Sequence, residues 1–352
     1  MITRKFLLAI SISFLLFILY FLFLIYSQPV AIVIPHHNLV QSTRQQFLKD
    51  ISRRRPLTRH IVLISPDHFS KRQTFVTGST RNWDLSSGTA IFNNFLSLDL
   101  PQNDAIQNDH GIFNPLADLR TYFPNADYFP VIIGQKTSVS DLQLLLTQLK
   151  KDCGFDCLVV SSVDFSHYLP ATMAFVHDAR TLNNLQNLDT EKLLSSEVDS
   201  PQSLYLLSSF AGHNQATRFS VFAHTNSGFI ASDPDAETTT HFFGSYSRGK
   251  KIPGNTYTFI HLPYSIDRTQ SQQTVGDRFF YGVDKTIVDS YVPNFAIAKI
   301  IAPGKVIKSF LPMDGNSFVR GPLKRQLIKQ YFDSISTTGV TKDYFWGTLT
   351  YE

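Results

Sequence analysis

Residues 30–65 of the chain read VAIVIPHHNLVQSTRQQFLKDISRRRPLTRHIVLIS. The stretch opens with a short run of mostly β-branched residues at 30–34, continues with an amphipathic segment at 41–53, and closes with a second apolar run at 60–65. This pattern is typical of two strands that are joined by a crossover helix. It therefore predicts an α/β fold in which a sheet lies between layers of helices.

The same alternation continues to about residue 248. Further strands are predicted at residues 128–133, 157–162, 219–223 and 241–246, and further helices at residues 139–151, 170–185 and 203–211. Leucines at helical spacing support the first of these helices, namely Leu142, Leu145, Leu146 and Leu149. We predict that residues 29–248 form one three-layer α/β domain.

The texture of the sequence changes at residues 249–352. Gly and Pro separate short aromatic and β-branched runs there, and one amphipathic helix is predicted near residues 322–335. This segment contains no catalytic motif. We predict a small strand-rich C-terminal addition that serves as a structural cap or a contact surface.

Composition excludes several classes of function. The 32 basic and 28 acidic side chains leave a net charge of +4, and no basic run is interleaved with aromatic residues, so nucleic acid is not an expected partner. The sequence also lacks the GxSxG, HExxH, P-loop and GxGxxG motifs. Serine hydrolase, zincin and nucleotide-binding functions therefore have no sequence support.

An apolar segment precedes the predicted domain. Residues 6–26 carry no charge, and at ~1.5 Å per residue a helix of this length spans the ~30 Å core of a bilayer. The segment ends without an Ala-x-Ala site, which favours an uncleaved anchor over a signal peptide. Arg4 and Lys5 precede it and no Lys or Arg follows until Arg44. The positive-inside rule then predicts a single-pass membrane protein with residues 1–28 as the anchor, a cytoplasmic N-terminus and an extracytoplasmic main domain.

Two cysteines, Cys153 and Cys157, are present. An extracytoplasmic location would permit a disulfide between them. Two unpaired thiols are the alternative, because residues four apart must meet a strict Cα separation before they can bond.

Histidine and aspartate recur at the ends of the predicted strands, where open α/β sheets collect their ligands. If the strands are parallel, His36, His68 and Asp164 should converge on one point, and His110 and His167 should line the same cavity. Imidazole and carboxylate groups suit Fe, Zn or Cu, and an open position on such an ion can activate water or dioxygen.

Local geometry refines this set. His36 and His37 are adjacent, so on an extended chain only one of the two can face the site. Asp164 and His167 are three apart, and one helical turn would place both on one side. Asp178 and His213 are reserve candidates near the cluster, and the other histidines are interpreted as structural: His60, His177, His224, His241 and His261.

The segments that contain these histidines and aspartates resemble, in order, the sequence blocks of the AmmeMemoRadiSam system protein B, or Memo-like, family. The blocks are Pro35-His36-His37-Asn38-Leu39-Val40, Ser65-Pro66-Asp67-His68-Phe69, Asp109-His110-Gly111-Ile112 and Val163-Asp164-Phe165-Ser166-His167-Tyr168. Two further blocks fit, Val176-His177-Asp178 with Leu188-Asp189 and the closing Thr240-His241-Phe242-Phe243-Gly244-Ser245-Tyr246. The resemblance covers residues 29–248.

The resemblance implies a fold similar to class III extradiol dioxygenases, with a cleft that binds iron, copper or zinc. It implies metal-binding roles for His36 and His68 and places in the cleft for His110, Asp164 and His167. Where the family has a Cys-Gly pair that can complete the metal site, the chain has Ala211-Gly212. Either His213 or Asp164 fills the gap, or the metal site is weaker, or the chemistry is lost.

Three functions remain open. The first is a metal-dependent enzyme, redox or dioxygenase-like, in which His36 and His68 hold the ion while His110 or His167 moves protons. The second is a non-catalytic module that holds a peptide or small molecule near the membrane. The third is an envelope scaffold whose C-terminal addition contacts a partner.

Overall fold

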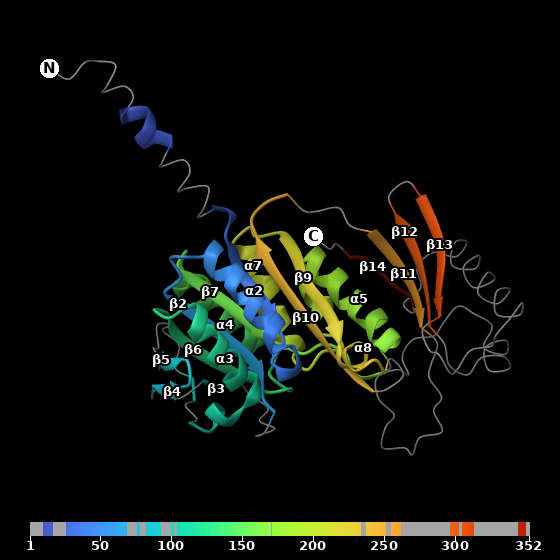
Figure 1. The fold of residues 1–352 in the computed structure, drawn as a ribbon, viewed down its shortest axis with the longest axis horizontal. Helices are drawn as coiled ribbons and strands as arrows, with labels where there is room; N and C mark the ends of the chain where they lie inside the picture. The colour runs from blue at the N-terminus through green and yellow to red at the C-terminus, as the bar shows by residue number, and fades with distance from the viewer. Residues whose placement is uncertain are drawn as a thin grey trace, which may run out of the picture.

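The fold is seen in a computed structural model (Figure 1). It describes residues 10–16, 26–68, 76–77, 82–92, 100–101, 104–169, 171–233 and 237–250, together with four later strands whose bounds are given below.

The main sheet has ten strands in the order β4-β5-β6-β2-β7-β1-β10-β8, with β3 beside β6 and β9 beside β10. Strands β5, β6, β2, β7 and β1 are parallel neighbours, and β10 runs antiparallel to β1. The strands are β1 (Pro29–Ile34), β2 (His60–Pro66), β3 (Val76–Thr77), β4 (Trp83–Leu85), β5 (Gly88–Phe92), β6 (Asp127–Ile133), β7 (Cys157–Ser162), β8 (His167–Leu169), β9 (Arg218–Asn226) and β10 (Thr238–Ser247). The six strands predicted within residues 29–248 are thereby confirmed.

The four predicted helices of this part of the chain agree with the observed ones to within two residues at each end. The observed helices are α2 (Gln41–Arg54), α3 (His110–Tyr122), α4 (Val139–Asp152), α5 (Ala171–Asn187), α6 (Thr190–Leu193), α7 (Pro201–His213) and α8 (Ser227–Ala231), with short 3-10 turns η1 (Asn38–Val40) and η2 (Asp104–Asn108). Of these, α3, α6, α8 and the two 3-10 turns had no specific prediction.

Two separate hydrophobic clusters show that the sheet is the middle of three layers. One face packs against α2 and α3, through residues such as Phe47 and Leu116. The other packs against α4 and α7, through residues such as Leu145 and Leu206. All six residues of β1 are buried, because a parallel strand with helices on both faces has no solvent side. The predicted mixed α/β architecture is confirmed.

A second, four-stranded antiparallel sheet follows in the C-terminal part. Its order is β13-β12-β11-β14, from β11 (Asn255–His261), β12 (Ala296–Ala302), β13 (Lys305–Pro312) and β14 (Tyr344–Leu349). Helix α5 contacts both β10 of the main sheet and β14 of this second sheet (Figure 1). The predicted strand-rich character is confirmed in these strands, while the helix expected near residues 322–335 lies outside the described residues and the boundary at residue 248 stays a prediction.

The apolar segment at residues 6–26 is described only at residues 10–16 and 26. Among the described residues, the structure contains no helix with the length and apolar character needed to cross a bilayer.

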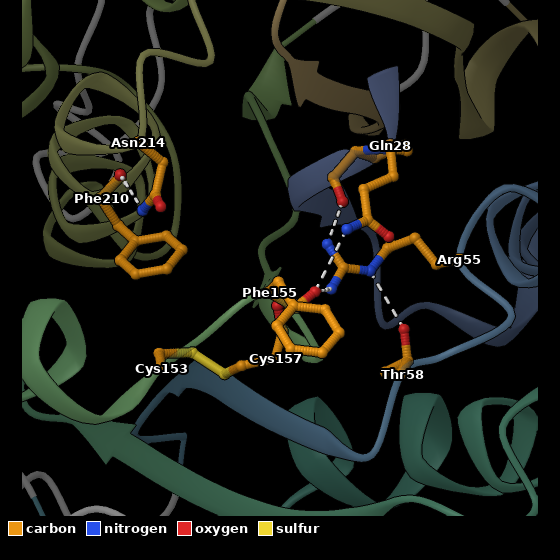
Figure 2. Close-up of a disulfide and its surroundings, with 9 residues drawn as sticks. Gln28, Arg55, Thr58, Cys153, Phe155, Cys157, Phe210 and Asn214 are labelled. Atoms are coloured by element: carbon orange, nitrogen blue, oxygen red, sulfur yellow. Dashed lines mark hydrogen bonds between the residues drawn. A yellow bond between two sulfur atoms is a disulfide. The ribbon is translucent and has the colours of Figure 1, made fainter. Parts of the chain in front are cut away.

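The amino end of the parallel strands is held by a disulfide and a buried arginine (Figure 2). Cys153 follows α4 and Cys157 begins β7, and the two form a disulfide with their Cα atoms 5.2 Å apart. The fully buried Arg55 donates to the carbonyl oxygens of Phe155 and Cys157 at 2.8 Å, and it also donates to the Pro29 carbonyl at the start of β1. This network therefore ties the loop before β7 to β1 at the edge where both strands begin.

Candidate metal centre

The opposite, carboxyl edge of the sheet gathers the predicted site residues. Strand β7 lies between β2 and β1 and is parallel to both. His36 follows β1, His68 follows β2 and Asp164 follows β7. Their convergence is therefore a consequence of strand order, because neighbouring parallel strands end at the same edge.

His36 is buried at the centre of the group. Its Nδ1 lies 3.2 Å from Ser162 Oγ, and that hydroxyl donates to the carbonyl oxygen of Gly111 at 2.6 Å. The Ser162 oxygen can then accept from Nδ1–H, which leaves Nε2 with the lone pair. Burial lowers the pKa of His36 to about 4, although the charge of Asp164 opposes the shift. His36 is thus a neutral imidazole at physiological pH, the form that binds metals.

Two aspartates face the Nε2 atom of His36. The Oδ2 atoms of Asp164 and Asp199 each lie 3.3 Å from it. Burial alone would raise the pKa of Asp164, but the neighbouring His36 and His241 bring it below its ordinary value. Burial and the charge of Asp164 raise the pKa of Asp199 well above its ordinary value. The charge of Asp164 therefore disfavours ionisation of Asp199.

His68 is oriented by a carboxylate of its own. Its Nδ1 lies 2.7 Å from Asp109 Oδ1, and its backbone N–H donates to Asp109 Oδ2 at 3.0 Å. Asp109 also accepts from the backbone N–H of Gly111 at 2.9 Å, which caps α3. With Nδ1 bound to Asp109, the lone pair of His68 is on Nε2. Such carboxylate–histidine pairs set the tautomer and ring direction of metal ligands.

His110 completes the histidine group at the solvent side. Its ring centroid lies 3.8 Å from that of His68 and 5.1 Å from that of His36. The ring centroids of His36 and His68 are 4.8 Å apart. His110 is exposed. Burial and the neighbouring His68 lower the pKa of His110, so it is neutral near pH 7 and able to accept a proton.

Two groups of side chains could each hold a metal ion, and they share His36. In each group the ligand atoms lie within 4.8 Å of one another. A tetrahedral ion with bonds of ~2.0–2.1 Å places its ligand atoms ~3.3 Å apart. The two aspartate oxygens lie at this separation from His36 Nε2. The groups are His36, His68 and His110, and His36, Asp164 and Asp199.

The loop that carries His36 is braced from two helices. The buried Arg44 of α2 donates to the carbonyl oxygens of Pro35 and His37, both at 3.2 Å. Asn114 of α3 donates to the carbonyl oxygen of His36 at 3.0 Å. The position of the central histidine is therefore set by hydrogen bonds on both sides of the loop.

Comparison with known families bears on this site. The family model for Memo-like proteins matches residues 24–239. The chain belongs to the Memo-like protein family. A MEMO1 family protein of Thermoplasma volcanium is 24% identical to the chain over 228 residues, a match that covers 59% of the chain and 82% of that protein. An uncharacterized protein from Escherichia coli K12 of known structure is 11% identical, with a TM-score of 0.40, over 62% of the chain and 99% of that protein.

In this Memo-like chain the predicted residues gather around His36, which is in one metal-capable group with His68 and His110 and in the other with Asp164. His167 begins β8, is partly buried, and is in neither metal-capable group. The prediction that one helical turn joins Asp164 and His167 is wrong, because residues 163–166 have no helical structure. The proton-transfer roles of His110 and His167 stay predictions.

Of the two residues that could fill the place of the family's cysteine, Asp164 is in a metal-capable group and His213 is not. Ala211 is packed in the hydrophobic core and His213 is the exposed last residue of α7. Asn214, which follows His213, accepts through its backbone oxygen from Arg248, and Arg248 directly follows Ser247, the partner of Pro29 at the start of β1. The end of α7 is therefore at the amino edge of the sheet, away from the metal-capable groups. Asp178, the other reserve candidate, binds Ser166 and His224 instead.

Sequence reasoning missed Asp199. It is not at a strand end, but directly before Ser200 and Pro201, which cap and begin α7. A crossover helix begins at the carboxyl edge of the sheet. Residues directly before such a helix therefore lie at the same edge as residues directly after a strand. The Ser-Pro helix start was the signal that could have indicated Asp199 in this Memo-like chain.

Proposed function

We propose that this Memo-like protein is a metal-dependent enzyme that holds one transition-metal ion between His36, His68, Asp164 and Asp199. The observation that carries the proposal is a pair of carboxyls, one buried and one largely buried, facing a neutral imidazole. In the described part of the chain, the ion pairs of Asp164 and Asp199 are with histidines only. One oxygen of each carboxyl is also buried without a hydrogen-bond partner. Buried acidic groups of this kind are stable when a cation binds them.

The donor atoms indicate which ions fit. Imidazole nitrogens and carboxylate oxygens suit Fe(II) and Zn(II), whereas Cu(I) favours thiolate or thioether sulfur. Both cysteines are in the disulfide at the opposite edge of the sheet, so neither can supply a thiolate. We therefore rank Fe(II) and Zn(II) above copper among the three metals that the sequence suggested.

The residues around the site have distinct tasks in this proposal. When bound, the ion supplies Lewis-acid or redox chemistry to a substrate at an open position. Ser162 and Asp109 hold the rings of His36 and His68 through their Nδ1 atoms. His110, neutral and exposed beside His68, takes a proton from the substrate or returns one to it. The proposed reaction class is dioxygenase-like, in line with the fold that the family resemblance implied.

Metal content of the purified full-length protein tests this proposal. After incubation with Fe(II), Zn(II) or Cu(I) and removal of loose ions, we expect about one equivalent of Fe(II) or Zn(II) and less copper. Asp199→Asn keeps the shape of the side chain. It should weaken metal binding by ~10–100-fold or more, because a group at the metal site is lost. Asp189→Asn, at a partly exposed pair with Lys192, is the matched control and should bind as the wild type does. A wild-type protein that takes up none of the three ions would favour a non-catalytic binding module instead.

We further propose that residues 6–26 anchor the protein in a membrane with the main domain outside. The uncharged segment and the basic residues before it support this topology. Strand β1 begins at Pro29, and its six residues at ~3.3 Å each separate that point from the metal site by ~20 Å. The site would therefore face away from the bilayer.

A topology reporter fused after Glu352 tests the membrane proposal. We expect the reporter to be active outside the cytoplasm and the protein to stay with the membrane fraction after an alkaline wash. A cytoplasmic reporter, or a mature chain that begins near Gln28, would contradict it.

A further inference from the structure

His241 is a buried histidine to which no role has been given so far. It lies on β10 with 0% of its surface exposed. Within the described part of the chain, neither of its ring nitrogens makes a hydrogen bond. A buried polar group that lacks a partner costs about 1–3 kcal/mol, so its presence requires an explanation.

The antiparallel register of β10 brings this residue to the metal site. Gly244 is paired with Val33 of β1. Continuing the register by three residues places His241 level with His36, beyond the carboxyl end of β1. Strand β10, which runs antiparallel to β1, thus delivers a side chain to the edge where the parallel strands end.

Two backbone hydrogen bonds hold the loop after β7 against the same part of β10. The N–H of Phe165 donates to the carbonyl oxygen of Thr240, and the N–H of Thr240 donates to the carbonyl oxygen of Ser166, both at 2.9 Å. Asp164, which precedes this pair of bonds, is consequently fixed beside His241.

The carboxyl of Asp164 lies between two histidines. Its Oδ2 is 3.3 Å from His36 Nε2, on the side of the proposed ion. Its Oδ1 has no hydrogen-bond partner and is 3.7 Å from His241 Nδ1. A movement of less than ~1 Å would close that gap to the ~2.7–2.9 Å of a hydrogen bond to a carboxylate.

His37 closes this arrangement from the solvent side. Its ring stacks on that of His241 with centroids 5.1 Å apart and planes 29° apart. The Nδ1 of His37 accepts from the backbone N–H of Leu39 at 3.2 Å, so this nitrogen is engaged in capping η1. His37 therefore covers the ring of His241 on one side. The carboxylate that lies beside His241 is that of Asp164.

We propose that His241 is a positioning residue for the metal centre. Its Nδ1–H binds Oδ1 of Asp164 and keeps Oδ2 directed at the ion. The inference rests on the proposed function, because it assigns a task to His241 only if Asp164 binds a metal. It explains why a histidine occupies a fully buried position on a central strand.

A matched pair of substitutions tests this role in the full-length protein. Asn and Leu are similar in size, but only Asn has an N–H near the position of Nδ1. We expect His241→Leu to weaken Co(II) and Zn(II) binding by roughly 10–100-fold, the usual effect of losing a hydrogen-bond partner of a metal ligand. His241→Asn should retain most of the affinity. The Co(II) absorption spectrum should change in the Leu variant and resemble the wild type in the Asn variant, which a merely structural role would not produce.

His60→Leu is the control, because it removes a histidine from the opposite end of β2, and it should bind Co(II) as the wild type does. Melting temperatures show that the variants compared are folded. Equal affinities in the wild type, Leu and Asn variants would overturn the inference alone. Equal losses in the Leu and Asn variants would also overturn it, since the hydrogen bond would then not be the cause. A wild-type protein that binds no Co(II) or Zn(II) would overturn the proposed function and this inference with it.

Discussion

Replacement of His68 with alanine should abolish stoichiometric metal binding and leave the protein folded. His68 is held by Asp109 through Nδ1 at 2.7 Å, so its Nε2 is presented to the group around His36. Loss of an outer partner of a ligand already weakens metal sites by ~10–100-fold, and loss of the ligand itself should exceed this. The side chain is partly exposed, so its removal leaves no large cavity in the core.

His37→Ala is the matched control for this variant. His37 is adjacent to His36, but its Nδ1 caps η1 and its ring stacks on His241. We expect the His37 variant to bind close to one equivalent of Zn(II). Metal content after dialysis and thermal melting of both variants provide the measurement. One full equivalent of zinc in His68→Ala would rule out His68 as a ligand.

Replacement of Asp118 with alanine should lower the free energy of unfolding by about 3–5 kcal/mol, the range measured when one partner of a buried ion pair is removed. Asp118 Oδ2 accepts from Arg44 Nε at 2.7 Å, and Arg44 is fully buried. The alanine variant would leave a buried guanidinium without its counter-ion. Because Arg44 also braces Pro35 and His37, the loop of His36 should become less well fixed and metal affinity should fall as well.

Asp50→Ala is the control for the stability prediction. Asp50 pairs with Arg54 on the exposed face of the same helix, α2, and such exposed pairs contribute ~0–1 kcal/mol. Urea unfolding of the two variants, followed by circular dichroism, compares them directly. A loss below about 1 kcal/mol in Asp118→Ala would show that the neutral carbonyl acceptors alone stabilise Arg44.

The sequence by itself determined six of the ten strands of the main sheet, the helices α2, α4, α5 and α7, and three of the four residues proposed to hold the ion. Runs such as residues 30–34 and the leucines of α4 have periods that depend only on local backbone geometry. The positions of His36, His68 and Asp164 directly after strands were sufficient to predict their convergence, because parallel neighbours end at one edge. Family resemblance, carried by the same segments, was confirmed by the match over residues 24–239.

Only the tertiary structure decided which other side chains complete the site. Asp199 arrives from the start of α7, and His241 arrives on β10, which runs antiparallel to β1. His213, a candidate for the place of the family's cysteine, is carried by that helix to the opposite edge of the sheet. Hydrophobic periodicity sets what each segment becomes. The start of α7, the end of β7 and strand β10 meet only because of the strand order and register of the sheet. Packing of the whole sheet determines that order and register.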